Sequence, residues 1–238
     1  MISPAALKQR LVFTATEPYR AAGRFAYHFA RGKLAGDPAF TAILARGLIP
    51  DQARVLDLGC GQGLLAAWLL AADACHRAGE WCGDWPAPSR LRSLQGIELM
   101  TADVERARRA LGPKAAIEVG DIRSAPFGDA NAIVILDVLH YIDRASQETV
   151  LDRARAALSH TGVLLLRIGD ADAGLPFKIS NWVDQTVLMA RGHGWIRLHC
   201  RAVTEWLDVL SRRGFRTDPL PMSAGTPFAN VLLVARPR

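Results

Sequence analysis

The feature that most constrains this chain is the run of residues 55–63, which is Val-Leu-Asp-Leu-Gly-Cys-Gly-Gln-Gly. Apolar and β-branched residues lead to an acidic residue, three glycines follow at alternate positions, and an apolar helical pattern begins at Leu64. This order predicts a strand, a tight turn and a helix. Glycines let the backbone turn without Cβ clashes, and the first turn of a helix presents unpaired N–H groups. The run therefore predicts a turn that holds a nucleotide-like ligand.

The spacing of the glycines distinguishes between two kinds of ligand. A dinucleotide-binding turn would need G-x-G-x-x-G, but the third glycine would fall on Leu64 when counted from Gly59 and on Ala66 when counted from Gly61. The pattern is instead D-x-G-x-G-x-G, and it resembles motif I of the class I methyltransferases that use S-adenosylmethionine (SAM). The resemblance implies a loop curled around the methionine part of SAM, formed by Asp57, Gly59, Cys60, Gly61 and Gly63.

From Ala53 onward, strand and helix patterns alternate along the chain. Such alternation is typical of an α/β fold in which helices cover both faces of a parallel sheet. Strands are expected at 55–57, 94–99, 116–119, 132–136, 163–168, 215–218 and 230–235, and helices at 64–72, 101–111, 143–159 and 203–213. The family resemblance implies a doubly wound, mostly parallel sheet of seven strands whose final strand is antiparallel.

A chain of 238 residues can form one compact domain with an ample core. We expect residues 51–238 to form the SAM-binding methyltransferase domain and residues 1–50 to form a helical cap segment. In the family, the segment before motif I usually folds over the SAM and substrate sites. Tyr27, Arg31 and Lys33 are therefore candidates to meet the SAM carboxylate.

An insertion at residues 73–93 separates the first helix from the second strand by more residues than usual. It contains Trp81, Cys82 and Trp85. Ligands of a doubly wound sheet bind outside the carboxyl ends of the strands, so a helix-to-strand connection lies at the opposite edge. We therefore expect the insertion to lie away from the chemistry, either as a packed flap or as a subunit contact in a homodimer.

A second long segment, residues 169–200, follows the fifth expected strand and so starts at the ligand edge of the sheet. It is apolar and rich in aromatic residues, which suits a lid that closes over a substrate and excludes water. Alternatively, its apolar residues form one face of a helix that packs on the sheet. On the lid hypothesis, the candidate substrate residues here are Trp182, His193, Trp195 and His199.

Two carboxylates follow the second and third expected strands. The Glu98 carboxylate has two acceptor oxygens on a short side chain, which suits hydrogen bonds from both hydroxyls of a ribose. Its sequence separation from Asp57 exceeds the usual value by about the length of the insertion. The resemblance implies that Leu99 packs on the adenine, that Asp121 accepts from the adenine amine, and that Ile122 contributes its backbone.

The fourth expected strand leads into residues 136–141, Leu-Asp-Val-Leu-His-Tyr, which resemble motif IV of the small-molecule branch of the family. The resemblance implies that the backbone of Leu136 and Asp137 borders the sulfonium, and that His140 and Tyr141 point toward the methyl acceptor. A histidine can take a proton at neutral pH, so His140 is the candidate general base, with His193 and His199 as second choices. A histidine that only caps or packs the start of a helix fits the sequence equally well.

Composition and charge indicate which classes of partner and which cellular location to expect. The formal net charge is +6, but all but four of the 29 basic residues are arginines scattered along the chain, which favours a solvated surface over a nucleic-acid site. The four cysteines form no C-x-x-C pair, which favours free thiols and no metal. No apolar run suits a membrane span and the N-terminus does not resemble a signal peptide, so a cytoplasmic location is expected.

These observations favour a SAM-dependent methyltransferase for a small aromatic or apolar acceptor. The sequence lacks the Asn/Asp-Pro-Pro of amino-modifying nucleic-acid enzymes and the added carboxylates of metal-dependent catechol enzymes. The alternatives are an RNA or protein methyltransferase, a nicotinamide-dependent oxidoreductase and a SAM-binding module without turnover. The oxidoreductase is disfavoured because the third fingerprint glycine and a Tyr-x-x-x-Lys pair are missing.

Overall fold

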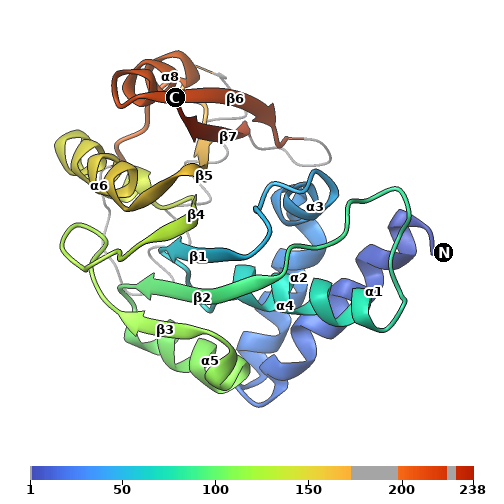
Figure 1. The fold of residues 1–238 in the computed structure, drawn as a ribbon. Coiled ribbons are helices and arrows are strands. Elements are labelled where there is room, and N and C mark those ends of the chain that lie inside the picture. Colours follow the sequence, from blue (N-terminus) through green and yellow to red (C-terminus); the bar gives the residue numbers. More distant parts are fainter. Residues whose placement is uncertain (1, 173–197, 224–228) are drawn as a thin grey trace. The chain divides into compact units, whose positions relative to one another are not determined.

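The computed structural model describes residues 2–172, 198–223 and 229–238. The strands of these residues form one seven-stranded sheet in the order β3-β2-β1-β4-β5-β7-β6 (Figure 1). β2 runs parallel to β1 and β3, whereas β7 runs antiparallel to β5 and β6. The predicted α/β class, the seven strands and the final antiparallel strand are confirmed. The strands are β1 (Ala53–Leu58), β2 (Leu91–Glu98), β3 (Ala116–Val119), β4 (Ala130–Leu136), β5 (Leu158–Gly169), β6 (Phe215–Pro221) and β7 (Asn230–Pro237).

The chain divides into two compact units, Met1–Ile133 and Val134–Arg238, which we call unit 1 and unit 2. In unit 1, four helical elements precede β1, and further helices follow β1 and β2. They are α1 (Pro4–Thr16), the 3₁₀ helix η1 (Glu17–Arg20), α2 (Arg24–Gly36), α3 (Pro38–Ala45), α4 (Leu64–Arg77), α5 (Thr101–Leu111) and the 3₁₀ helix η2 (Gly112–Lys114).

Local sequence explains where the first helices begin. The Ser3 hydroxyl accepts a hydrogen bond from the backbone N–H of Ala6 at 3.3 Å, and Asp37 accepts from Ala39 at 3.0 Å. Both residues are N-caps, and each is followed by a proline, which has no N–H to leave unpaired in the first turn. An N-cap side chain and a proline in the first turn therefore explain where α1 and α3 begin.

Helix α4 is the centre of the core of unit 1. It is buried over most of its surface, and both α1 and α3 contact it. Its Trp68 is fully buried and donates its indole N–H to the Phe40 carbonyl of α3 at 2.8 Å. The Phe40 and Trp68 rings also meet edge to face, with centroids 6.2 Å apart. The helices before β1 are thus packed directly onto the helix that follows the glycine turn.

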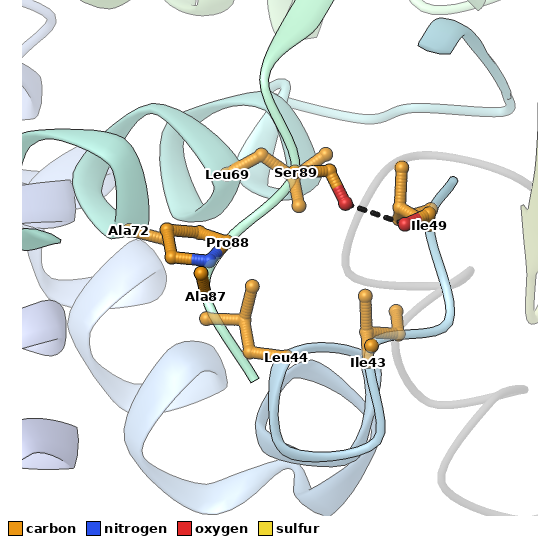
Figure 2. Close-up of a pocket in the computed structure, with 9 residues that line it drawn as sticks. Ile43, Leu44, Ile49, Leu69, Ala72, Ala87, Pro88 and Ser89 are labelled. Carbon is orange, nitrogen blue, oxygen red and sulfur yellow. Dashed lines mark hydrogen bonds between the residues drawn. The ribbon is translucent and has the colours of Figure 1, made fainter. Parts of the chain in front are cut away.

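The connection between α4 and β2 packs against α3 and α4. The expected bounds of the insertion, 73–93, were wrong: α4 extends to Arg77 and β2 begins at Leu91, so the connection spans residues 78–90. Ser89 donates its hydroxyl to the Ile49 carbonyl at 2.5 Å, and Arg90 binds Asp51 through its backbone N–H and its guanidinium. A subunit contact at this connection stays a prediction. Figure 2 shows the small apolar hollow where the connection meets the two helices, lined by Ile43, Leu44, Gly47, Ile49, Leu69, Ala72, Ala87, Pro88 and Ser89.

Gly96 in β2 is a position where only glycine fits. A Cβ there would lie 2.6 Å from Cys60 Sγ and 2.8 Å from Ile117 Cδ1. We expect Gly96→Ala to lower the free energy of unfolding by about 1–3 kcal/mol, because the core must shift to admit one methyl group. Gly32→Ala in α2 is the control, since a Cβ there meets no atom within 4 Å and alanine favours a helix. Urea unfolding measures both, and a Gly96→Ala protein as stable as wild type would contradict the expectation.

Unit 2 contains η3 (Leu139–Tyr141), α6 (Arg144–Ala157) and α8 (Val203–Arg212). A buried arginine, Arg201, ties the segment before α8 to α6. Its guanidinium donates to Gln147 at 2.8 Å, to Glu205 at 2.9 Å and to Glu148 at 3.0 Å. Two carboxylates thus balance the positive charge of Arg201, and hydrogen bonds satisfy its N–H groups, as a buried cation requires.

The four cysteines form no disulfide in the structure, and only Cys200 is more than slightly exposed. Within residues 2–172, 198–223 and 229–238, no helix combines the length and the apolar character needed to cross a membrane.

Candidate functional site

The glycine turn between β1 and α4 has the backbone that its sequence predicts. Gly59, Gly61 and Gly63 all have positive φ, at +72°, +54° and +73°. The N–H groups of Gly59 and Cys60 donate to the Ile97 carbonyl of β2, at 2.8 and 3.2 Å. A Cβ on Gly63 would lie 2.7 Å from Leu111 of α5, whereas a Cβ on Gly61 would meet nothing within 4 Å. The turn is therefore packed on one side and open over Gly61.

Glu98 closes this turn from the end of β2. Its Oε2 accepts from the Gly61 N–H at 2.8 Å, and its Oε1 accepts from the Met100 N–H at 2.9 Å. The side chain is mostly buried, and these two bonds fix its orientation. Each carboxylate oxygen has two lone pairs, so both can accept one more hydrogen bond. That arrangement fits the two hydroxyls of a ribose.

Asp57, the last acidic residue of β1, is a second buried carboxyl group in the same unit. Burial raises the pKa of Asp57 to about 8, and the Glu98 carboxylate adds to the increase. A buried carboxyl group beside the Glu98 carboxylate favours a cationic ligand at this place. SAM has a sulfonium and an ammonium group, so the acid pair fits its charge.

The adenine candidates lie at the ends of β2 and β3. The Asp121 carboxylate accepts from the backbone N–H of Arg123 at 2.9 Å and from its guanidinium, and this ion pair holds the pKa of Asp121 below its usual value. Ile122 is buried, whereas the Leu99 side chain is 60% exposed. Leu99 is therefore free to pack on a flat ligand, but Asp121 must share its carboxylate with Arg123.

Two residues of this site were missed from the sequence. Tyr19 of η1 is fully buried and donates its hydroxyl to the Gln62 carbonyl at 2.7 Å. The Gln62 side chain is only 1% exposed, and neither amide atom has a hydrogen-bond partner among the residues that the structure describes. The only hint in the sequence was that Tyr19 belongs to the segment before motif I. A buried amide without a partner, in the loop expected to hold SAM, fits a polar ligand group.

Of the three cap-segment candidates, Tyr27 and Arg31 come together. The Tyr27 hydroxyl accepts from Arg31 at 3.3 Å and from Arg20 at 3.1 Å, and the Arg20 guanidinium lies over the Tyr27 ring at 4.3 Å. Lys33 instead pairs with Asp37, the N-cap of α3, at 3.0 Å. Arg20 is thus an additional cation that the sequence did not single out.

The residues of motif IV lie at the end of β4 in unit 2. Asp137 has a positive φ of +58°, and the buried Arg167 of β5 holds its carboxylate with two hydrogen bonds, one of them 2.8 Å long. Burial lowers the pKa of His140 to about 4; the Asp137 carboxylate opposes this change and the Arg167 guanidinium adds to it. The His140 ring lies against Tyr141, with centroids 4.1 Å apart. His140 is therefore neutral at pH 7.

Gln147 of α6 holds the backbone around His140. Its amide N–H groups donate to the carbonyls of Leu139, Ile142 and His199, at 3.0, 3.1 and 2.7 Å. The His199 N–H in turn donates to the His140 carbonyl at 2.8 Å. The backbone of His199 thus anchors the turn that carries His140. The other substrate candidates, Trp182, His193 and Trp195, lie outside the described residues.

No group of three or more His, Cys, Asp or Glu side chains that could hold a metal ion occurs in the part of the chain that the structure describes.

Comparison with known families identifies the family of this chain. A family model described as a methyltransferase domain matches residues 27–218. The chain belongs to the class I SAM-dependent methyltransferases. SAM is the cofactor that this membership implies, and the glycine turn, Glu98 and Gln62 are compatible with it.

Individual relatives are more distant. A curated relative, the carboxy-S-adenosyl-L-methionine synthase of Chromohalobacter salexigens, is 32% identical over 140 residues. The match covers 54% of this chain and 47% of the relative, so the chain spans about half the length of that protein.

Two solved structures share the fold. The mitomycin 7-O-methyltransferase MmcR aligns with a TM-score of 0.60 and 20% identity, over 99% of this chain and 72% of that chain. The magnesium protoporphyrin IX methyltransferase ChlM from Synechocystis PCC 6803, solved with bound SAH, aligns with a TM-score of 0.56 and 17% identity, over 99% of this chain and 100% of that chain.

Proposed function

We propose that this protein transfers a methyl group from SAM to a small aromatic or apolar metabolite by direct in-line displacement. The observation that carries the proposal is the Glu98 carboxylate, fixed by the Gly61 N–H at the open side of a three-glycine turn. MmcR and ChlM act, by their names, on mitomycin and on magnesium protoporphyrin IX, and this supports a small-molecule acceptor.

In this proposal, the residues of unit 1 bind and orient the cofactor. Glu98 accepts hydrogen bonds from the ribose hydroxyls, and Asp121 accepts one from the adenine amine beside the exposed Leu99. The Gln62 amide offers one donor group and one acceptor to the amino and carboxylate groups of the methionine part. When bound, SAM supplies an electrophilic methyl group on a positively charged sulfur.

The acceptor side is assigned to motif IV and to the segment 169–200. The backbone of Leu136 and Asp137 borders the sulfonium in this assignment, and His140 and Tyr141 face the acceptor. Neutral His140 has a lone pair for a hydrogen bond, but a pKa of about 4 makes it a base suited to an acidic group such as a carboxylic acid. A phenol is far less acidic than a carboxylic acid. With a phenol, His140 would orient the hydroxyl through a hydrogen bond but would not keep the proton of the phenol.

Binding and turnover assays test the proposal. Titration with SAM and with NADH distinguishes a methyltransferase from a nicotinamide enzyme, and labelled SAM with a panel of phenols, acids and amines detects transfer. SAM binding without any transfer would favour a non-catalytic module. RNA binding that weakens steeply with salt would favour an RNA methyltransferase. A carboxylated SAM product would instead favour the activity that the Chromohalobacter relative's name describes.

SAM binding at pH 7 is expected to release up to about one proton per protein molecule. Burial raises the pKa of Asp57 to about 8, so Asp57 is mostly protonated in the free protein at pH 7. A bound cation stabilises the ionised carboxylate and lowers this pKa, so binding expels the proton. Titration calorimetry in buffers of different ionisation enthalpy measures the release. The release should disappear well above pH 8 and in Asp57→Asn, and identical heats in all buffers at pH 7 would contradict the prediction.

A further inference from the structure

The cofactor loop is held from outside by one residue of the cap segment. Gln62 lies between two glycines with positive φ and directly before Gly63, the N-cap of α4. The first hydrogen bond of α4 is accepted by the Gly63 carbonyl, from Ala67, so the Gln62 carbonyl lies outside the helical ladder. The hydroxyl of Tyr19 donates to it at 2.7 Å across a separation of 43 residues.

We propose that Tyr19 is a positioning residue for SAM: it sets the orientation of the glycine turn through the Gln62 carbonyl. The inference rests on the proposed role of that turn in SAM binding. Two flanking glycines give the peptide units around Gln62 little intrinsic preference, so hydrogen bonds set their orientation. The Gly63 N–H donates to the Cys60 carbonyl at 2.9 Å inside the turn, and Tyr19 holds the Gln62 carbonyl from outside it. Next to this carbonyl, Gly61 directs its N–H to Glu98. Tyr19, Gln62, Gly61 and Glu98 thus form one continuous chain of contacts.

The chemistry of Tyr19 suits a permanent contact. The side chain has no exposed surface, and burial raises the pKa of its hydroxyl, with Cys60 and Asp57 adding to the increase. The hydroxyl therefore remains a donor at all working pH values. A phenylalanine would fill the same space but would leave the Gln62 carbonyl without this donor.

The test compares Tyr19→Phe with a matched control, Thr16→Val. Thr16 is also fully buried and lies three residues earlier, but its hydroxyl donates to the Val12 carbonyl within α1. Each substitution removes one buried hydroxyl of the cap segment at constant shape. Thermal unfolding of both variants establishes that they fold and how much stability each loses.

Calorimetric binding of two probes then separates a positioning role from a structural one. S-adenosylhomocysteine contains the amino-acid part that the loop is proposed to hold, whereas 5′-methylthioadenosine lacks it. We expect Tyr19→Phe to weaken S-adenosylhomocysteine binding about tenfold and to leave 5′-methylthioadenosine binding within about twofold, with Thr16→Val changing neither. Equal losses for both probes, or equal losses in the two variants, would overturn the inference.

Two further outcomes distinguish a failure of this inference from a failure of the proposed function. If the wild-type protein binds neither SAM nor S-adenosylhomocysteine, the proposed function is wrong. If it binds both and Tyr19→Phe binds S-adenosylhomocysteine as wild type does, only the role of Tyr19 is wrong. Should Tyr19→Phe fail to fold, hydrogen exchange on wild type replaces it: S-adenosylhomocysteine should slow exchange in residues 16–22 as well as 56–65, and no change in residues 16–22 would overturn the inference.

Discussion

Glu98→Gln is expected to weaken SAM binding at least about 100-fold, an effect of roughly 3 kcal/mol. The carboxylate accepts from the N–H groups of Gly61 and Met100, and in the proposed complex it also accepts from the ribose. A glutamine amide keeps the size of the side chain but turns one acceptor into a donor, which then faces one of these N–H groups. Isothermal titration with SAM measures the change.

The matched control for this substitution is Glu118→Gln on β3. Glu118 has the same side chain but is exposed at the sheet edge of unit 1. We expect its SAM affinity to match wild type, and we expect urea unfolding to show that Glu98→Gln remains folded at the assay temperature. A folded Glu98→Gln protein that binds SAM as tightly as wild type would refute the assignment of the cofactor site.

Arg167→Met is expected to destabilise the protein by about 3 kcal/mol or more. Arg167 has almost no exposed side-chain surface and holds both oxygens of Asp137, so its removal leaves a partly buried carboxylate without its cation. Methionine has a similar length but no charge. Denaturant unfolding monitored by circular dichroism measures the loss, and a change below about 1 kcal/mol would show that the ion pair contributes little.

The control is Arg77→Met, which removes an exposed i,i+4 ion pair with Asp73 at the end of α4. Exposed pairs of this kind contribute only about 0.3–0.5 kcal/mol. A double variant, Arg167→Met with Asp137→Asn, should recover part of the loss, because it also removes the carboxylate that faced Arg167. Asparagine also tolerates the positive φ of residue 137.

Many of the helices and strands could be predicted because local residue patterns indicate them. The bounds of α5 and β3 are those expected from the sequence, since Gly112-Pro113 ends the helix and a short apolar alternation follows. The other strands were found in their correct places but are longer than predicted. The largest difference is in β5, which begins at Leu158 because the expected helix 143–159 ends at Ala157, and whose residues 159–162 lack a clear strand pattern. Secondary-structure ends of this kind depend on neighbouring strands rather than on local residues.

The side chains that fix the site could be predicted only in part. The carboxylates at strand ends could be proposed as cofactor ligands because parallel strands carry their ligands at one edge, and that role stays a prediction. Tyr19, Arg167 and Gln147 were not, because each acts through a partner distant in sequence, and a buried tyrosine or arginine has no periodic signature. The contact between Arg123 and Asp121 also shows that a carboxylate assigned to a ligand can have a competing partner two residues away.

The packing of the first helices on α4 has a consequence for how the protein is made. During synthesis, α1 and α3 leave the ribosome before α4, yet the buried side chains of α1 and the Phe40 carbonyl of α3 have their partners on or near that helix. The hydroxyl of Tyr19 likewise has no acceptor until Gln62 has been translated. The cap segment therefore cannot reach its final structure on its own, and its apolar surface stays exposed while the ribosome adds the residues up to about the end of α4. Chaperone binding to nascent chains would be concentrated in that interval.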